Sequence, residues 1–139
     1  MKLQKNALFA LYSVLESASQ PQRQLSAGEI ARKYRISPHH LAKVLHTLAR
    51  AGVVESVRGV GGGYRFAGNV KRLTLMDVIE LFENIGAPVR GAAPRRPRQG
   101  TGVERALGTV LSEIDAMAEA TLRSVSIATL LKLIARQRA

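Results

Sequence analysis

Hydrogen-bond donors and cations gather along one face of a helix that the sequence predicts from residue 37. Three donors in its first turns, which could reach the acceptor atoms of guanine and adenine, are His39, His40 and Lys43. The helix N-terminus, at Ser37 and Pro38, presents a partial positive charge that suits a phosphate. Thr47 and Arg50 lie farther along and are expected to meet a phosphate backbone. A solvated basic face is the alternative for this helix taken alone.

A glycine-dense turn follows the helix, with an arginine on either side. Four of the five residues from Gly59 to Gly63 are glycine, which permits positive φ angles and a close backbone approach to a partner. Arg58 and Arg65 could contact a phosphate or the minor groove. A plain hairpin also needs glycine, but one or two would serve it. A nucleotide-phosphate loop is a poor alternative, because neither a Lys-Ser/Thr pair nor a helix follows.

Two helices separated by a three-residue turn would position the donors. Ser26 and Glu29 fit a capping box for a first helix over about 26–33. Ser37 caps the second helix, and Gly52 is placed to end it in the left-handed conformation. The residues expected on its buried side are Leu41, Val44, Leu45 and Leu48. The pattern indicates a helix-turn-helix.

Further elements are expected on both sides of this pair. The β-branched runs at 53–57 and 64–66 predict a hairpin across the glycine turn. Apolar spacing predicts one helix over 3–18 and another over 71–85, capped by Thr74. The buried stripe of the latter is expected to be Leu75, Val78, Ile79, Phe82 and Ile85. These elements would complete a winged helix-turn-helix over 1–86.

The C-terminal part of the chain is predicted to pair two copies. Residues 87–102 carry too little apolar bulk to offset ordering entropy, which predicts a flexible basic linker, with or without a phosphate-binding role for its arginines. Beyond it, 103–139 predicts a long dimerisation helix over about 104–123 and a short last helix capped by Ser126. The expected dimer contacts are Leu107, Val110, Leu111, Ile114, Met117 and Leu122.

The charge distribution favours a polyanionic partner. The net charge is +11, and residues 1–72 hold 12 Lys and Arg against three Glu. A solvated surface could show the same excess, so charge alone does not decide. Three Tyr, three Phe and no Trp argue against a sugar site or a base-stacking platform. With no Cys in the chain, disulfides and thiolate metal sites are excluded.

Metal binding, catalysis and membrane insertion have little support. His39 and His46 would stand two helical turns apart, about 10 Å, too far to share one ion. The three carboxylates expected on the helix over 71–85 have no His or Lys among them, which is typical of a solvated acidic face. No apolar run approaches the roughly 20 residues of a membrane span, and the N-terminus lacks a signal-peptide core. We therefore expect a cytoplasmic protein that is not an enzyme and uses no cofactor.

Three stretches carry a more specific signal. They are the N-terminal helix, the run SPHHLAKVLHTLARAGVVESVRGVGGGYRFA, and the run LTLMDVIELFENIG. Together they resemble the Rrf2 family of winged-helix transcriptional regulators, the IscR, NsrR and CymR type. The likeness extends to about residue 86, and the final SIATLLKLI is similar to the short C-terminal helix of the family.

The resemblance implies a homodimeric bacterial transcription factor, usually a repressor, joined through its long C-terminal helix. It implies DNA contacts from Ser37–Lys43 and from the wing at Arg58–Arg65. The full set of candidate DNA-contact residues is Ser26, Ser37, Pro38, His39, His40, Lys43, Thr47, Arg50, Arg58, Gly59, Gly61, Gly62, Gly63, Tyr64 and Arg65. Cluster-binding members carry three cysteines in the segment that corresponds to 86–103, which has none here. An iron–sulfur cluster is therefore not expected, and the effector is unknown.

The sequence thus predicts a mainly α protein with a small β-hairpin: a winged helix-turn-helix followed by a long dimerisation helix. The expected function is sequence-specific binding of a double-stranded DNA operator by a homodimeric repressor without a cluster. Two alternatives stay open: a winged-helix module for protein interaction, and a non-specific architectural DNA binder.

Overall fold

The computed structural model describes residues 3–59, 62–83 and 100–138. The elements in chain order are α1 (Lys5–Ser19), α2 (Ala27–Tyr34), α3 (Pro38–Arg50), β1 (Val54–Val57), β2 (Gly63–Phe66), α4 (Leu75–Glu80), α5 (Gly102–Ser124) and α6 (Ile127–Arg138). The predicted fold class, mainly helical with one hairpin, is confirmed. No helix within the described ranges is long and apolar enough to cross a membrane.

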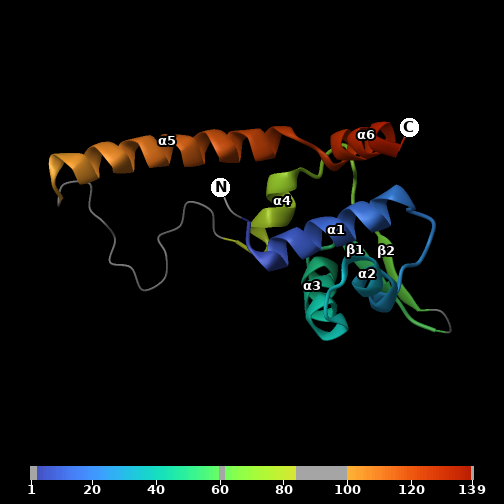
Figure 1. Cartoon of the computed structure of the whole chain (residues 1–139). Coiled ribbons are helices and arrows are strands. Elements are labelled where there is room, and N and C mark those ends of the chain that lie inside the picture. Colours follow the sequence, from blue (N-terminus) through green and yellow to red (C-terminus); the bar gives the residue numbers. More distant parts are fainter. Residues whose placement is uncertain (1–2, 60–61, 84–99, 139) are drawn as a thin grey trace.

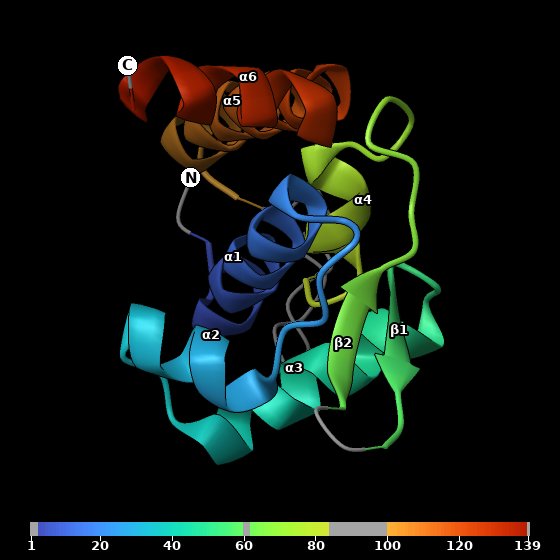
Figure 2. The ribbon, with the colours of Figure 1, turned by 90° about the vertical axis from the view of Figure 1, so that its right-hand side faces the viewer.

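The first four helices and the hairpin form one compact unit, which we call the head (Figure 1). Helix α6 lies against α1 at one side of the head, and α5 runs outward from it. Figure 2 shows α3 and the hairpin on the side of the head away from α5 and α6. The surface expected to contact DNA and the surface expected to pair two copies therefore lie on opposite sides.

Helix α1 lies at the centre of the head, and most of its buried residues have small side chains. Ala7, Ala10 and Val14 have no exposed surface. Two buried serines satisfy their hydroxyls locally: Ser13 donates to the Phe9 carbonyl at 2.9 Å and Ser17 donates to the Ser13 carbonyl at 2.8 Å. Because Leu11 is the one large side chain among the buried residues of α1, α3 and α4 can pack closely on this helix.

The helix-turn-helix forms as the caps predict, with one exception. Ser26 accepts the N–H of Glu29 at 3.0 Å, and Ser37 accepts the N–H of His40 at 3.5 Å. The predicted capping box at α2 is wrong, because the Glu29 carboxylate does not return to Ser26. It pairs instead with the Arg23 guanidinium at 3.1 Å, a cation supplied by the preceding loop. Arg35, at φ 56°, ends α2 in the left-handed region.

The hairpin is extended by a third backbone segment that the sequence did not reveal. β1 and β2 pair antiparallel from Val54↔Phe66 to Val57↔Gly63. Leu25, in the loop before α2, then bonds to the outer edge of β2, with both N–H···O distances to Tyr64 at 2.8 Å. The loop between α1 and α2 is thereby fixed to the wing.

Helix α4 is shorter than the predicted span of 71–85. Its start is set by Thr74, whose hydroxyl accepts the N–H of Asp77 at 3.2 Å, while the Asp77 carboxylate accepts the N–H of Thr74 at 2.9 Å. The residues before Thr74 form a turn instead of helix. Met76 is 1% exposed, although the predicted stripe omitted it. Ile85, which that stripe included, lies outside the described residues.

The two C-terminal helices begin at hydroxyl caps. Thr101 accepts the N–H of Glu104 at 3.2 Å and starts α5 slightly earlier than predicted. Ser126 accepts the N–H of Thr129 at 3.2 Å, as expected for the last helix. Ile127, directly after that cap, is fully buried in the core of the head. The division into 1–86, 87–102 and 103–139 stays a prediction, and most of its linker falls outside the described residues.

Candidate nucleic-acid interface

The exposed face of α3 is held firmly by its buried face. Leu41 and Leu48 have no exposed surface and Leu45 is 1% exposed, so the helix cannot rotate without opening the core. On the other side, the exposed residues at spacings of four, three and four are His39, Lys43, His46 and Arg50. This spacing places all four on one stripe. Three of the predicted contact residues, His39, Lys43 and Arg50, are thereby brought together.

His40 points elsewhere. Its Nε2 atom is hydrogen-bonded to Asn6 Oδ1 of α1, and its ring meets Phe9 edge-on at a centroid distance of 5.4 Å. A base contact would require the imidazole to leave both partners. In this structure, therefore, His40 fixes the start of α3 against α1. Thr47 is half-buried, and its hydroxyl donates to the Lys43 carbonyl at 3.2 Å.

Ser26 and Ser37 have a structural role as helix caps that is compatible with a contact to DNA. Each hydroxyl oxygen accepts a backbone N–H of its own helix. Each hydroxyl hydrogen can still be donated to a phosphate oxygen, because a hydroxyl accepts and donates at once. Pro38 is exposed beside Ser37. The starts of α2 and α3 therefore each retain a donor.

The glycines of the wing are needed for reasons within the chain. Gly59 has φ +119°, which disfavours any L side chain. A Cβ on Gly62 would lie 2.6 Å from the Val57 carbonyl oxygen, and one on Gly63 would lie 2.5 Å from that of Leu25. The density of glycine therefore does not by itself demand a close partner. Gly61 lies outside the described residues.

The two arginines of the wing differ in their surroundings. Arg65 donates from Nε to Glu55 Oε1 at 2.9 Å, and both side chains are exposed. Such a surface pair contributes about 0–1 kcal/mol, so a phosphate could replace the carboxylate. Arg58 is exposed and has no ion-pair partner among the residues described. Tyr64 is half-buried against the core.

Sequence reasoning did not include Arg35 in the candidate set. This residue forms the turn between α2 and α3, is exposed, and stands two positions before the Ser37 cap. Its cation therefore lies at the entrance to α3. Helical periodicity does not reveal Arg35, because this residue is outside both helices; its charge and its position between two predicted helices are the signals in the sequence that point to it.

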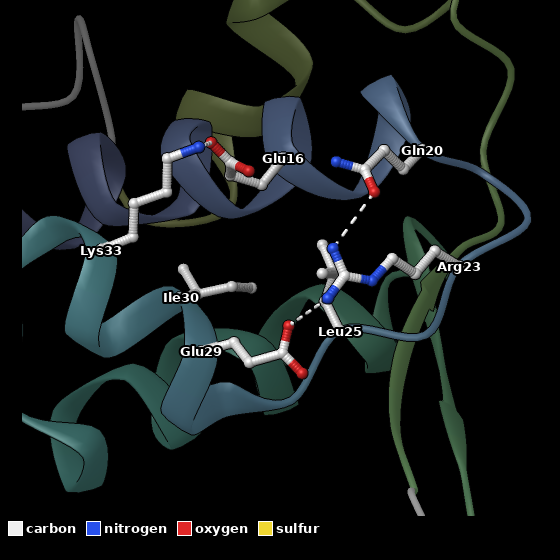
Figure 3. Close-up of a pocket in the computed structure, with 7 residues that line it drawn as sticks. All are labelled: Glu16, Gln20, Arg23, Leu25, Glu29, Ile30 and Lys33. Atoms are coloured by element: carbon white, nitrogen blue, oxygen red, sulfur yellow. Dashed lines mark hydrogen bonds and ion pairs between the residues drawn. The ribbon is translucent and has the colours of Figure 1, made fainter.

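A small pocket of about 140 Å³ lies between α1, α2 and the loop that joins them. Figure 3 shows that its charged side chains face one another. Arg23 donates to Gln20 at 3.3 Å and pairs with Glu29, and Lys33 Nζ is 2.6 Å from Glu16 Oε1. All four charges are already neutralised in pairs. We call the contacts of Glu16, Arg23, Glu29 and Lys33 the brace, because they hold α2 and the loop against α1.

The contacts around the brace determine the protonation of the Glu16 carboxyl and of the neighbouring Tyr34 phenol. Burial acts to raise the pKa of Glu16, but hydrogen bonds from Lys33 and Tyr34 outweigh it and hold that pKa below the ordinary value of 4.5. Burial and the neighbouring Glu16 carboxylate together raise the pKa of the Tyr34 phenol well above its usual range. Tyr34 is also stacked on Tyr12 at a centroid distance of 4.5 Å. The carboxylate and the neutral phenol therefore lock α2 onto α1.

A capped helix pair, a hairpin wing and an exposed basic stripe on α3 together define the winged helix-turn-helix class of DNA-binding proteins. The chain belongs to the Rrf2 family: the family model described as "Iron-dependent Transcriptional regulator" matches residues 3–133.

Relatives agree with this membership, and solved structures share the fold. BadM of Rhodopseudomonas palustris, named as an HTH-type transcriptional regulator, is 56% identical over 138 residues, covering 99% of this chain and 86% of BadM. NsrR of Shouchella clausii is 34% identical over 85 residues, covering 60% of this chain and 57% of NsrR. CymR, the global cysteine regulator of B. subtilis, has the same fold with a TM-score of 0.76 at 24% identity, covering 96% of this chain and 98% of CymR. IscR of T. potens also has this fold, with a TM-score of 0.73 at 22% identity, covering 95% of this chain and 87% of IscR. The protein is a DNA-binding transcriptional regulator.

The family description names iron, but this chain does not have the ligands for a cysteine-ligated iron cluster. The 139 residues contain no Cys, and thiolates are the ligands that hold such clusters. Within the described ranges, no group of three His, Cys, Asp or Glu gathers at one point.

Proposed function

We propose that this regulator is a homodimeric repressor that reads an operator with two-fold symmetry through α3 and the wing. The observation that carries the proposal is the stripe on α3, which is exposed, basic and rigidly backed by the core. The first turns of α3 would enter the major groove, where Lys43 and His39 donate to base acceptors. Thr47, Arg50 and Arg58 would contact phosphates, and these contacts position the protein without reading sequence.

The remaining candidates support these contacts. Arg65 would exchange its carboxylate partner for a phosphate, and Ser26 and Ser37 would donate their hydroxyl hydrogens at the two helix starts. His40 would position α3 from behind instead of touching a base. Arg35, between the two helices, would add a further phosphate contact.

A second copy of the chain is the proposed partner of α5. The large apolar side chains exposed on this helix are Val103 (69%), Leu107 (58%), Val110 (52%), Leu111 (58%), Ile114 (50%) and Met117 (69%). Their spacing places them on one face, and a continuous apolar face of this size is typical of an interface. Leu122, also predicted in this contact, packs against the core of its own head instead. The proposed interface is therefore the part of α5 from Val103 to Met117.

The test is selection of preferred sites from random duplexes by the full chain, followed by titration of the best site and of random DNA at several salt concentrations. The proposal expects a site of two symmetric halves about one helical turn apart, bound about 1,000-fold or more tightly than random DNA. Equal affinity for both at every salt concentration would make the protein an architectural binder. Failure to bind any DNA, at any salt concentration, would favour a protein-interaction module.

A further inference from the structure

The C-terminal end of α5 is tied to the head by a short backbone ladder. The residues after α5 run antiparallel to the turn before α4, through a bridge between Thr74 and Ser126. The hydrogen bonds of this ladder are Leu75 N–H to the Val125 carbonyl (3.0 Å), Ile127 N–H to the Leu73 carbonyl (2.8 Å) and Ala128 N–H to the Val70 carbonyl (2.9 Å). We name the segment 122–128 the joint.

Side chains hold the joint on both sides of this ladder. Ile127 has no exposed surface and belongs to the core of the head. Leu122 packs against that core from the last turn of α5. Arg123 pairs with Glu80 of α4 and with Glu119 one turn earlier on α5. The end of α5 is therefore fixed to α4 by apolar packing, an ion pair and backbone hydrogen bonds together.

The first part of α5, residues 102–117, has no support from its own chain within the described residues. Every residue from Gly102 to Met117 is exposed, and Figure 1 shows this part of the helix leaving the head. The 23 residues of α5 span about 34 Å. A change of about 10° at the joint would move the far end by about 6 Å, close to two base-pair steps of about 3.4 Å. A small change in the angle at the joint therefore produces a large displacement at the far end of α5.

We propose that the joint fixes the separation of operator half-sites that the regulator accepts. This inference rests on the proposed function, in which two α5 helices pair and each carries one head. The position of one α3 relative to the other then depends on the angle between α5 and its head. A rigid joint holds the two helices at one separation, whereas a loose joint would let each head move to half-sites at several separations.

The experiment compares the wild-type chain with a variant that carries Gly-Gly inserted between Ser124 and Val125. The insertion leaves Ile127 and the backbone ladder in place but frees α5 from the direction that they impose. A matched control carries the same insertion between Gly100 and Thr101, two exposed residues that precede the start of α5. Each protein is tested by light scattering for its mass and by titration with duplexes whose half-sites stand at the preferred separation or two base pairs closer or farther.

Two base pairs turn the second half-site by about 70° around the DNA axis, so a rigid dimer cannot follow it. We expect the wild type and the control to lose about tenfold or more in affinity at the altered separations, and the joint variant to lose less than about threefold. Mass and affinity for a single half-site should be equal in all three.

Two results would overturn the inference alone: a joint variant with the wild-type preference, or a dimeric wild type that binds all separations equally. A wild type that is monomeric or binds no DNA would overturn the proposed function and this inference with it. If the insertion prevents folding, the double variant Leu122→Ala/Arg123→Gln replaces it, because it removes the side-chain contacts of α5 with the head and leaves Ile127 and the backbone ladder in place. The affinity of this variant should fall only about threefold at the altered separations, compared with about tenfold for the wild type. An unchanged preference would again contradict the inference.

Discussion

At the scale of single residues, substitutions at Lys43 and Arg58 test the proposed division between base contacts and phosphate contacts. Lys43→Ala should weaken binding to the selected site by about 1–3 kcal/mol and relax the preference at one base position, because a base-edge donor is lost. Arg58→Ala should weaken binding to all DNA sequences alike. It should also reduce the slope of log affinity against log salt concentration by about one, because one fewer counterion is released. Titration of selected and random duplexes over a salt series measures both. Lys71→Ala, an exposed lysine in the turn before α4, is the matched control.

A Lys43→Ala protein whose losses on selected and random DNA are equal would assign Lys43 to the phosphate backbone. The stripe of α3 would then be positioned at the groove edge, and base reading would have to come from His39 or the wing.

The Glu16 brace makes a prediction about pH. Because the folded pKa of Glu16 is lowered, its contribution to stability is present above the ordinary value of 4.5 and is lost as the pH falls through the folded pKa. Glu16→Gln should therefore cost about 1 kcal/mol of unfolding free energy at pH 7, and the difference should shrink below about pH 4. Urea unfolding at a series of pH values measures this. Glu113→Gln, on exposed α5, should show no such difference.

Adjacent residues with the same chemistry can have different roles, and this limits what the sequence predicts. His39 and His40 are equivalent in composition, but only His39 lies on the exposed stripe, since His40 contacts Asn6 and Phe9 of α1. Position 63 must be glycine because a side chain there would collide with the backbone of Leu25, which is 38 positions earlier in the chain. Both distinctions depend on contacts between segments far apart in the chain, which no local pattern records.

At the scale of elements, the helices whose ends are set by neighbouring residues were predicted well. The caps at Ser37 and Thr74 are local, and both are present. The end of α4 was not predictable in the same way, because an apolar spacing continues through Phe82 although the helix itself ends at Glu80. The packing of α6 on the head was missed because α6 lies against α1, which is more than 100 positions earlier in the chain.

Ile127 tests whether α6 belongs to the head. Ile127→Ala should lower the unfolding free energy of the head by about 2–5 kcal/mol, because the side chain is fully buried and a cavity would remain. Leu133→Ala, in the same helix but 45% exposed, should change it by less than about 0.5 kcal/mol. Thermal or urea unfolding of the two variants gives the comparison.

Equal stability of these two variants would show that α6 is not part of the folding unit. If the predicted loss is found, a fragment ending at residue 86 lacks a core residue of the head. Such a fragment would then be a poor probe of dimerisation, and substitutions on α5 are the better choice.

At the scale of the whole molecule, α3 and α5 lie on opposite sides of the head (Figures 1 and 2). A second copy can therefore cover α5 without blocking α3. The apolar stripe of α5 was readable in the sequence, because a helix that packs on nothing in its own domain still shows its period. The way in which α5 is attached to the head was not, since it depends on the packing of Ile127 and Leu122.

This arrangement predicts that pairing and folding can be separated on α5. Leu111→Glu places a charge within the exposed apolar face, where pairing would bury it without a partner. The variant should be monomeric by light scattering, with a circular dichroism spectrum close to that of the wild type. Its affinity for the two-half operator should fall by about 100-fold or more, because one head no longer holds the second near its half-site.

Ser112→Glu is the matched control, since this exposed neighbour adds the same charge on the opposite face of the helix. It should keep both the wild-type mass and the wild-type affinity. If Leu111→Glu also stays dimeric, the interface lies away from the exposed stripe and the assignment of α5 to pairing is wrong. If it is monomeric yet binds the operator as tightly as the wild type, each head acts alone and the operator needs no two-fold symmetry.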